Sequence, residues 1–240
     1  MGIIRDPNQI VDKYVSDYLN ALKDNLISVI MYGSAVSHQY RAGKSDINTL
    51  IITKSYEINE LSKCRQVVKK WLKYKVTIPF FMTTEYIQNA LDVYPVEFID
   101  ISSNYKVLYG EDIFKDINFN KHHIRLQCER ELRGLDLYLR TEYLKIENDK
   151  KELNYFLNKL IKRLLPIFKA LLILKEKSIP KINNEIILLV EGEYKIKESI
   201  FSALINIENK KIKIFSVNEL FNKISNGLRA LIEEVNSFNF

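Results

Sequence analysis

The sequence predicts an α+β protein, with a β-sheet flanked by helices in residues 1–118 and an all-α helical bundle in residues 119–240. Short apolar runs of strand composition, separated by turn residues, occur in the first half of the chain. From about Lys121 they give way to long helical periods with few turn signals. A chain of 240 residues, 47% of them hydrophobic, is long enough for one or two such domains.

The first half begins with a predicted helix over residues 7–24. Asp6 is suited to cap its N-terminus, and its apolar residues recur at helical spacing. Thr83 or Thr84 is predicted to cap a short helix that ends near Leu91. Between these two helices, we expect a strand, a second strand, a helix and a third strand over residues 26–32, 47–53, 59–74 and 76–82.

Two more strands complete the predicted sheet. A strand is predicted over residues 94–101, which begin with a turn at Tyr94 and Pro95. After the turn, the segment is apolar apart from Glu97 and Asp100. Acids inside such a run are costly unless they are paired or bind a cation. Residues 105–112 then close the sheet with a strand and a turn.

The second half is predicted to be helical throughout. Two long amphipathic helices cover residues 122–146 and 150–177, the second with a kink at Pro166, and a last helix covers residues 217–235. Two shorter helices follow Asn183 and Lys195. Apolar positions of the second long helix are expected in the core: Phe156, Leu160, Leu164 and Phe168. A charged stripe on the first is expected to form a solvated face of i, i+4 pairs, with a face toward a cleft as the alternative: Arg125, Glu129, Arg133 and Arg140.

The most informative motif lies between the first two strands. Gly33 and Ser34 follow the first strand, and after eleven intervening residues Asp46, Ile47 and Asn48 open the second. Glycine lets the backbone approach a phosphate closely, and neighbouring N–H groups and the Ser34 hydroxyl can donate to its oxygens. Alternate residues of a strand point to one face, so Asp46 and Asn48 should project together.

This arrangement resembles the signature of the nucleotidyltransferase superfamily, which includes polymerase-beta-like enzymes and aminoglycoside nucleotidyltransferases. The family pattern is Gly-Ser or Gly-Gly, about a dozen residues, and two carboxylates that flank a hydrophobic residue. The resemblance implies a mixed sheet of the nucleotidyltransferase fold. It also implies a metal site, with Asp46 and residue 48 holding Mg²⁺. Here residue 48 is Asn48, which offers a carbonyl oxygen without charge and therefore weakens that site.

The same resemblance implies a nucleoside triphosphate, most simply ATP, as substrate. The residues expected to contact it are Gly33, Ser34, Arg41, Lys44 and Ser45. Arg41 and Lys44 supply a positive patch between the Gly-Ser turn and Asp46, although a solvated loop explains them equally well. Relatives with a following helical domain hold the acceptor between the two domains.

Family members place a third carboxylate on a later strand, often as the base that takes the acceptor proton. Glu97 and Asp100 are the candidates here, and in a strand they would face opposite sides of the sheet. Glu97 is favoured because it lies between Val96 and Phe98, in a hydrophobic-Glu-hydrophobic pattern similar to the family's third position. Asp100 is the second choice.

Charge and composition limit the classes of binding partner that the sequence favours. The net charge is +6, but basic residues are spread along the chain, so a nucleic-acid partner is disfavoured without being excluded. No segment approaches the ~20 apolar residues of a membrane helix, and no secretion signal begins the chain. We therefore expect a cytoplasmic protein without a membrane partner. Cys64 and Cys128 are expected to be buried thiols, since no zinc or redox spacing surrounds them.

Three functions follow from these observations. The first is metal-dependent transfer of a nucleoside monophosphate to a hydroxyl of a small molecule or protein, with Asp46 holding metal and Glu97 or Asp100 as base. The second is nucleotide binding without turnover, in a regulatory or antitoxin-like role. The third is an interaction protein that uses the helical half. A fused helical ribonuclease is disfavoured, because His122 and His123 precede every Arg of that half.

Overall fold

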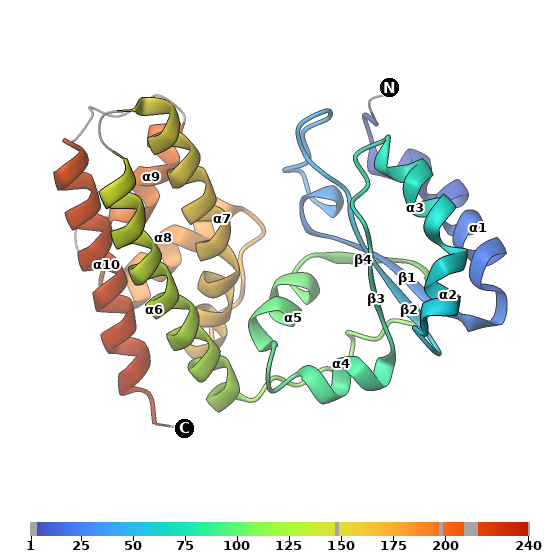
Figure 1. The fold of residues 1–240 in the computed structure, drawn as a ribbon. Helices are drawn as coiled ribbons and strands as arrows, with labels where there is room; N and C mark the ends of the chain where they lie inside the picture. Colours follow the sequence, from blue (N-terminus) through green and yellow to red (C-terminus); the bar gives the residue numbers. More distant parts are fainter. Residues whose placement is uncertain (1–3, 147–148, 197–198, 209–215, 240) are drawn as a thin grey trace. The chain divides into compact units, whose positions relative to one another are not determined.

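The structure, a computed structural model, describes residues 4–146, 149–196, 199–208 and 216–239 (Figure 1). The chain forms two compact units. Unit 1 consists of Met1–Leu91 and Asp100–Asn118, and unit 2 consists of Asp92–Ile99 and Phe119–Phe240.

Unit 1 contains a mixed sheet, as the sequence predicts, with four strands in place of the five expected. The strands are β1 (Leu26–Tyr32), β2 (Asn48–Thr53), β3 (Phe80–Met82) and β4 (Tyr105–Gly110). Their order is β3-β2-β1-β4, in which β1 is antiparallel to β2 and β4, and β2 is parallel to β3. An isolated parallel bridge from Ile47 to Val76 extends the β2–β3 pairing toward the Gly33 end of β1.

The helices of unit 1 follow the prediction with local differences. Asp6 caps a 3-10 turn, η1 (Pro7–Ile10), which continues into α1 (Val11–Leu22) and η2 (Lys23–Asn25). The predicted helix over residues 59–74 is divided at Cys64 into two helices. The Thr83 hydroxyl accepts from Tyr86 N–H and so caps the predicted short helix. These helices are α2 (Ile58–Lys63), α3 (Arg65–Leu72) and α4 (Thr84–Ala90).

The core of unit 1 joins one face of the sheet to α1 and α3, which lie on one side of the strands in Figure 1. The Tyr14 hydroxyl of α1 bonds to Thr49 Oγ1 of β2 at 2.6 Å. Its ring lies 5.3 Å from that of Trp71 of α3, and Trp71 Nε1–H donates to Asp17 Oδ2 at 2.8 Å. Partners from neighbouring elements therefore satisfy the polar groups of Tyr14 and Trp71, whereas the buried Tyr18 hydroxyl of the same core has no hydrogen-bond partner among the described residues.

The segment predicted as a strand over residues 94–101 is instead a helix, α5 (Pro95–Ser102), so that prediction is wrong. Proline suits the first position of a helix, because its missing N–H is one that would have no partner there. The N–H of the second residue, Val96, has no acceptor within the helix, and it donates instead to Gln127 Oε1 at 2.8 Å. Val96 and Ile99, three residues apart, both belong to the core of unit 2. Packing at helical spacing thus decides the conformation of a run whose composition suits either structure.

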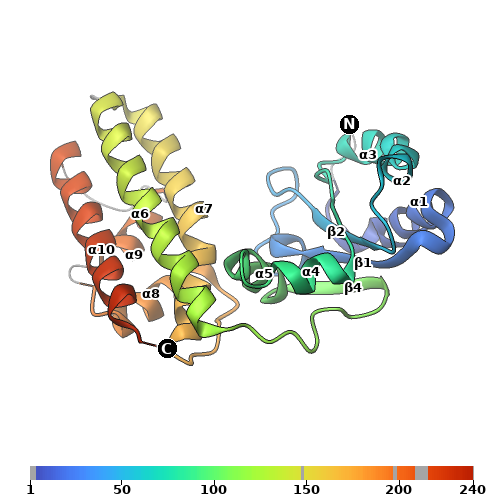
Figure 2. The same ribbon diagram turned by 60° about the horizontal axis from the view of Figure 1, so that its bottom comes forward.

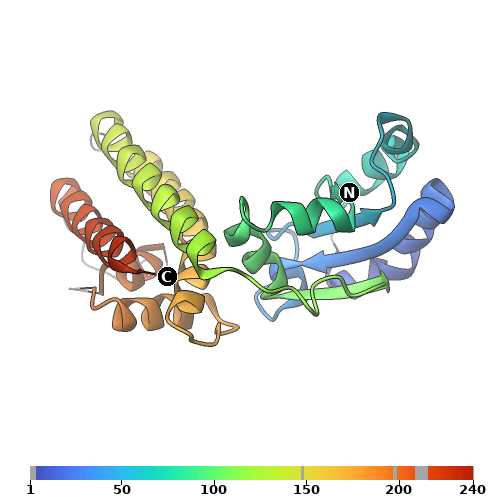
Figure 3. The same ribbon diagram turned by 90° about the horizontal axis from the view of Figure 1, so that it is seen from below.

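Unit 2 is helical, as predicted. Its long helices are α6 (Lys121–Lys145), α7 (Lys150–Leu174) and α10 (Val217–Ser237), and its short ones are α8 (Asn183–Glu193) and α9 (Ile200–Glu208). Figure 2 shows α6 between α7 and α10, and Figure 3 shows the orange segment of α8 and α9 alongside α7. The helix α7 continues through Pro166, and a kink there stays a prediction. Across the described residues, we find no helix with the length and apolar character needed to cross a bilayer.

Close helix packing and a buried cap hold unit 2 together. The four core positions predicted in α7 are buried. A Cβ added to Gly227 of α10 would lie 2.9 Å from Phe201 Cζ, so the glycine permits the close approach of α10 and α9. The buried Glu191 carboxylate of α8 accepts from Phe201 N–H at 2.7 Å and Ser202 N–H at 3.0 Å, and it thereby caps α9. The charged stripe of α6 forms the expected i, i+4 pairs, including Arg125–Glu129 at 3.0 Å and Arg133–Glu129 at 2.8 Å, but the side chains of Arg125 and Glu129 are only 14% and 18% exposed, so this part of the face is not solvated as expected.

Candidate functional site

Gly33 forms a tight turn at the end of β1. Its φ of +75° lies in the left-handed region that favours glycine, and the 3-10 turn η3 (Gly33–Val36) begins there. Asn104, just before β4, holds the turn from both sides. Gly33 N–H donates to the Asn104 carbonyl at 2.9 Å, and Asn104 Nδ2 donates to the Gly33 carbonyl at 2.9 Å. The turn that the sequence motif predicts is therefore held in place by the segment that leads from α5 into β4.

Asp46 and Asn48 flank a buried residue, Ile47, which is the burial pattern expected if both side chains lie on the side of the chain away from the core. The Ile47 side chain is fully buried. Its backbone carbonyl accepts from Thr77 N–H at 2.9 Å, and its N–H donates to the Lys75 carbonyl at 2.9 Å. This bridge keeps the segment extended, so residues 46 and 48 point away from the core that holds Ile47. Asn48 lies opposite Tyr32 in the β1–β2 register, which brings it next to the Gly33 turn. Asp46 is exposed.

The amide of Asn48 has two neighbours. Its Oδ1 accepts from Thr77 Oγ1 at 3.1 Å. Its Nδ2 lies toward Gly33, since a Cβ built on that glycine would stand 3.6 Å from Nδ2. Asn48 is thus held across the turn by a hydroxyl from the strand connection that precedes β3.

The loop between the turn and Asp46 carries the expected positive charge. Arg41 and Lys44 are exposed, and neither side chain has an ion-pair partner among the residues that the structure describes. Ser45 Oγ accepts from Arg41 N–H at 3.0 Å, so this hydroxyl closes the loop. Lys75 Nζ donates to the Gly43 carbonyl at 2.7 Å and adds a third cation to this loop.

Tyr40 ties the same loop to the N-terminal segment. Its hydroxyl donates to the Ile4 carbonyl at 3.0 Å. Burial, with a smaller contribution from the Asp46 charge, raises the pKa of Tyr40. The Tyr40 hydroxyl thus anchors this loop to residue 4 and lies near enough to Asp46 to sense its charge.

The two candidates for the third carboxylate lie in different surroundings. Because α5 is a helix, Glu97 and Asp100 are neighbours three residues apart, and the expectation of opposite sheet faces is wrong. Within unit 2, Gln127 Nε2 donates to Glu97 Oε2 at 2.6 Å. Within unit 1, burial and, to a smaller extent, the Asp100 charge raise the pKa of Tyr32 to about 12. Asp100 is therefore close enough to the end of β1 to act on its last residue.

The donor set fits one divalent cation that arrives with a triphosphate. Mg²⁺ is commonly held by one or two carboxylates, several waters and phosphate oxygens, and Asp46 supplies one exposed carboxylate. Asn48 brings no charge, and its carbonyl oxygen is engaged by Thr77. Within the described ranges, no cluster of three or more His, Cys, Asp or Glu side chains could hold a metal by itself.

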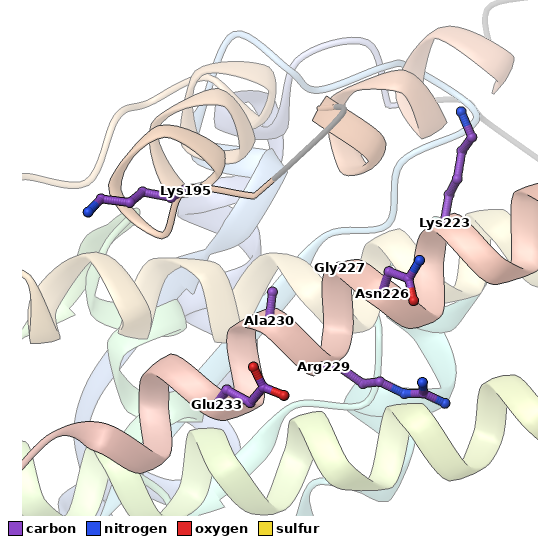
Figure 4. Close-up of a pocket in the computed structure, with 7 residues that line it drawn as sticks. All are labelled: Lys195, Lys223, Asn226, Gly227, Arg229, Ala230 and Glu233. Atoms are coloured by element: carbon purple, nitrogen blue, oxygen red, sulfur yellow. The ribbon is translucent and has the colours of Figure 1, made fainter.

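Unit 2 contains a separate cavity of about 500 Å³, lined by Lys195, Lys223, Asn226, Gly227, Arg229, Ala230 and Glu233 (Figure 4). Lys195, Lys223 and Arg229 extend in different directions there, so their charges do not converge on one point. Lys223 is also paired with Glu219 at 3.4 Å. We therefore place the candidate site in unit 1.

Sequence reasoning missed Asn104 and Thr77. Asn104 lies in a short polar turn, and only the β1–β4 pairing brings it beside Gly33. Thr77 looks like an ordinary strand residue, and only the parallel bridge at Ile47 places it beside Asn48. The local signal at Thr77 is a hydroxyl within an otherwise apolar run of the sequence.

No protein-family model and no curated protein sequence matches the chain. A similar solved structure is that of spectinomycin adenyltransferase AAD(9) from Enterococcus faecialis with ATP and spectinomycin. The two structures align with a TM-score of 0.53 and 13% identity, over 92% of this chain and 99% of the other. Similarity at this level of identity concerns the fold, and it confirms the predicted class: a nucleotidyltransferase-fold mixed sheet with a helical domain after it.

Proposed function

We propose that the chain binds a nucleoside triphosphate, with ATP as the first candidate, and transfers its nucleoside monophosphate to a hydroxyl of a small molecule or protein. One observation carries this proposal. The β1–β2 register sets the Gly33 turn beside Asn48 and, two residues away on the same side, Asp46. This supports a site in which the turn would donate to phosphate and Asp46 would hold a metal at one end of the sheet, in a fold similar to that of an adenyltransferase solved with ATP.

Each residue then has a specific role. The Ser34 hydroxyl and backbone N–H groups of the Gly33 turn donate to phosphate oxygens. Arg41 and Lys44 offset the phosphate charge from the loop, and Ser45 shapes that loop. Asp46 holds Mg²⁺, which neutralises charge on the phosphates when it is bound.

The third carboxylate in this proposal is Asp100, because its charge acts on Tyr32 at the end of β1. Glu97 is second, since it belongs to unit 2, where Gln127 donates to it, whereas Gly33, Asp46 and Asp100 belong to unit 1. In the transfer, the acceptor oxygen bonds to the α-phosphorus as the bond to pyrophosphate breaks. The acceptor proton passes to the carboxylate.

The test is transfer of label from ATP labelled at the α-phosphate to a panel of hydroxyl-bearing acceptors. Spectinomycin comes first, because it is bound with ATP in the similar structure. We expect Asp46→Ala to abolish transfer while leaving urea unfolding unchanged. The control is Asp24→Ala, which removes an exposed acid near the opposite end of β1 and should keep activity. Full transfer by Asp46→Ala would overturn the assignment.

A second function, nucleotide binding without turnover, is supported by Asn48. A neutral amide replaces a charge-bearing ligand, and its oxygen is already bonded to Thr77. Loss of one charge-stabilising group costs roughly 10²–10³ in rate. Tight ATP binding by the wild type without transfer to any acceptor would favour this function.

A further inference from the structure

The orientation of the Asn48 amide determines what it offers to a ligand. A threonine hydroxyl carries a single hydrogen, and its shorter contact is the one to Asn48 Oδ1, at 3.1 Å, while the Ile47 carbonyl lies at 3.3 Å. With Oδ1 engaged in this way, the Nδ2 group is on the Gly33 side. The side chain thus turns two N–H donors toward the phosphate-binding turn.

A donor at this position reverses the electrostatics of the family pattern. A carboxylate at residue 48 would repel a phosphate unless a cation lay between them. An amide N–H group binds a phosphate oxygen directly, and a hydrogen bond to an ionised acceptor is stronger than a neutral one. Arg41, Lys44 and Lys75 lie on or against the same loop and add positive charge.

We propose that Asn48 binds a phosphate group of the nucleotide directly through Nδ2–H, with Thr77 as its positioning residue, so that no second divalent cation is needed to hold the triphosphate. This inference rests on the proposed function, because the ligand is the same triphosphate. It differs from a weakened metal site, since Asn48 contributes to binding when no metal is present.

The test is calorimetric titration of ATP, and of inorganic tripolyphosphate as a probe without a nucleobase, in Mg²⁺ and in EDTA. The wild type should bind ATP in both solutions. Asn48→Ala should weaken binding in EDTA about tenfold or more, as expected for one hydrogen bond to a charged group. Asn48→Asp should also lose binding in EDTA, and its ratio of Mg²⁺ to EDTA affinity should rise at least about tenfold above that of the wild type.

A matched pair of variants tests the positioning role of Thr77. Thr77→Val keeps the shape and removes the hydroxyl, whereas Thr77→Ser keeps the hydroxyl. We expect Thr77→Val to lower the affinity for ATP in EDTA by about three- to tenfold, and Thr77→Ser to stay close to the wild type. A merely structural role would change the unfolding midpoint without this difference in affinity.

Three results would overturn the inference. Unchanged ATP affinity of Asn48→Ala in EDTA would show that the amide does not touch phosphate. Wild-type binding that requires Mg²⁺ would make Asn48 at most a metal ligand and would leave the proposed function standing. No ATP binding by the wild type in either solution would remove the proposed function together with the inference.

Discussion

Gly33 and Gly110 share a backbone conformation but differ in the space for a side chain. Their φ angles are +75° and +77°. A Cβ on Gly33 would have Asn48 Nδ2 as its nearest neighbour, at an ordinary 3.6 Å, whereas a Cβ on Gly110 would lie 1.9 Å from the Ile27 carbonyl oxygen. Substitution by alanine therefore tests backbone strain alone at Gly33, and strain together with a backbone clash at Gly110.

The expected magnitudes follow from these two conditions. The left-handed conformation costs a non-glycine residue ~1–2 kcal/mol, and the smaller entropy of the unfolded alanine chain returns ~0.4–1 kcal/mol. Gly33→Ala should therefore destabilise unit 1 by about 1 kcal/mol. Gly110→Ala carries the same strain, and it must also displace the backbone of β1, so its cost should reach about 3 kcal/mol or more.

Urea unfolding followed by tryptophan fluorescence measures both costs. Trp71 is the only tryptophan of the chain and is buried in the core of unit 1, so its emission reports on that unit. Equal losses for the two variants would refute the distinction in available space. No loss for Gly33→Ala would refute the backbone strain at the turn.

Three further outcomes concern charge and burial. The Arg133 guanidinium holds the pKa of the Glu129 carboxyl below its ordinary value of 4.5. The pair therefore stabilises the folded state at neutral pH, and this stabilisation is lost as the pH falls from 4.5 through the lowered pKa. Glu129→Gln should remove that part of the pH dependence of thermal unfolding followed by circular dichroism. Burial raises the pKa of the Cys64 thiol to about 11 and raises that of Cys128, so Ellman's reagent should modify neither before urea unfolds the chain. Glu191→Gln should lower the free energy of unfolding by about 1 kcal/mol in urea titrations, because the cap of α9 loses its charge.

The sequence predicts elements well where local signals agree. The residues of β1 combine strand composition with a Gly-Ser turn after them, and the strand ends at Tyr32 as expected. Thr83 caps α4 through the interaction that its residue type favours. Neither element needs information from a distant part of the chain.

The sequence does not predict local structure correctly where residues far along the chain determine the conformation. The α5 segment has a composition that suits a strand, and Gln127, more than 25 residues further along, satisfies the N–H of Val96 at the start of the helix. The same limit applies at the candidate site. Gly33, Asp46 and Asn48 can be read from their spacing, but the direction of the Asn48 amide depends on Thr77, which only strand pairing brings close.

The path of the chain between the two units has a practical consequence for dissecting them. It passes from one unit to the other three times, after Leu91, Ile99 and Asn118. A fragment that ends at residue 118 would keep the segment 92–99 but lose the core that receives Val96 and Ile99. Its complement would lack those two side chains and would leave the buried Gln127 amide without its partners. Neither half is thus a self-sufficient module that a single cut can release, and exchange of the helical half between proteins would have to carry residues 92–99 with it.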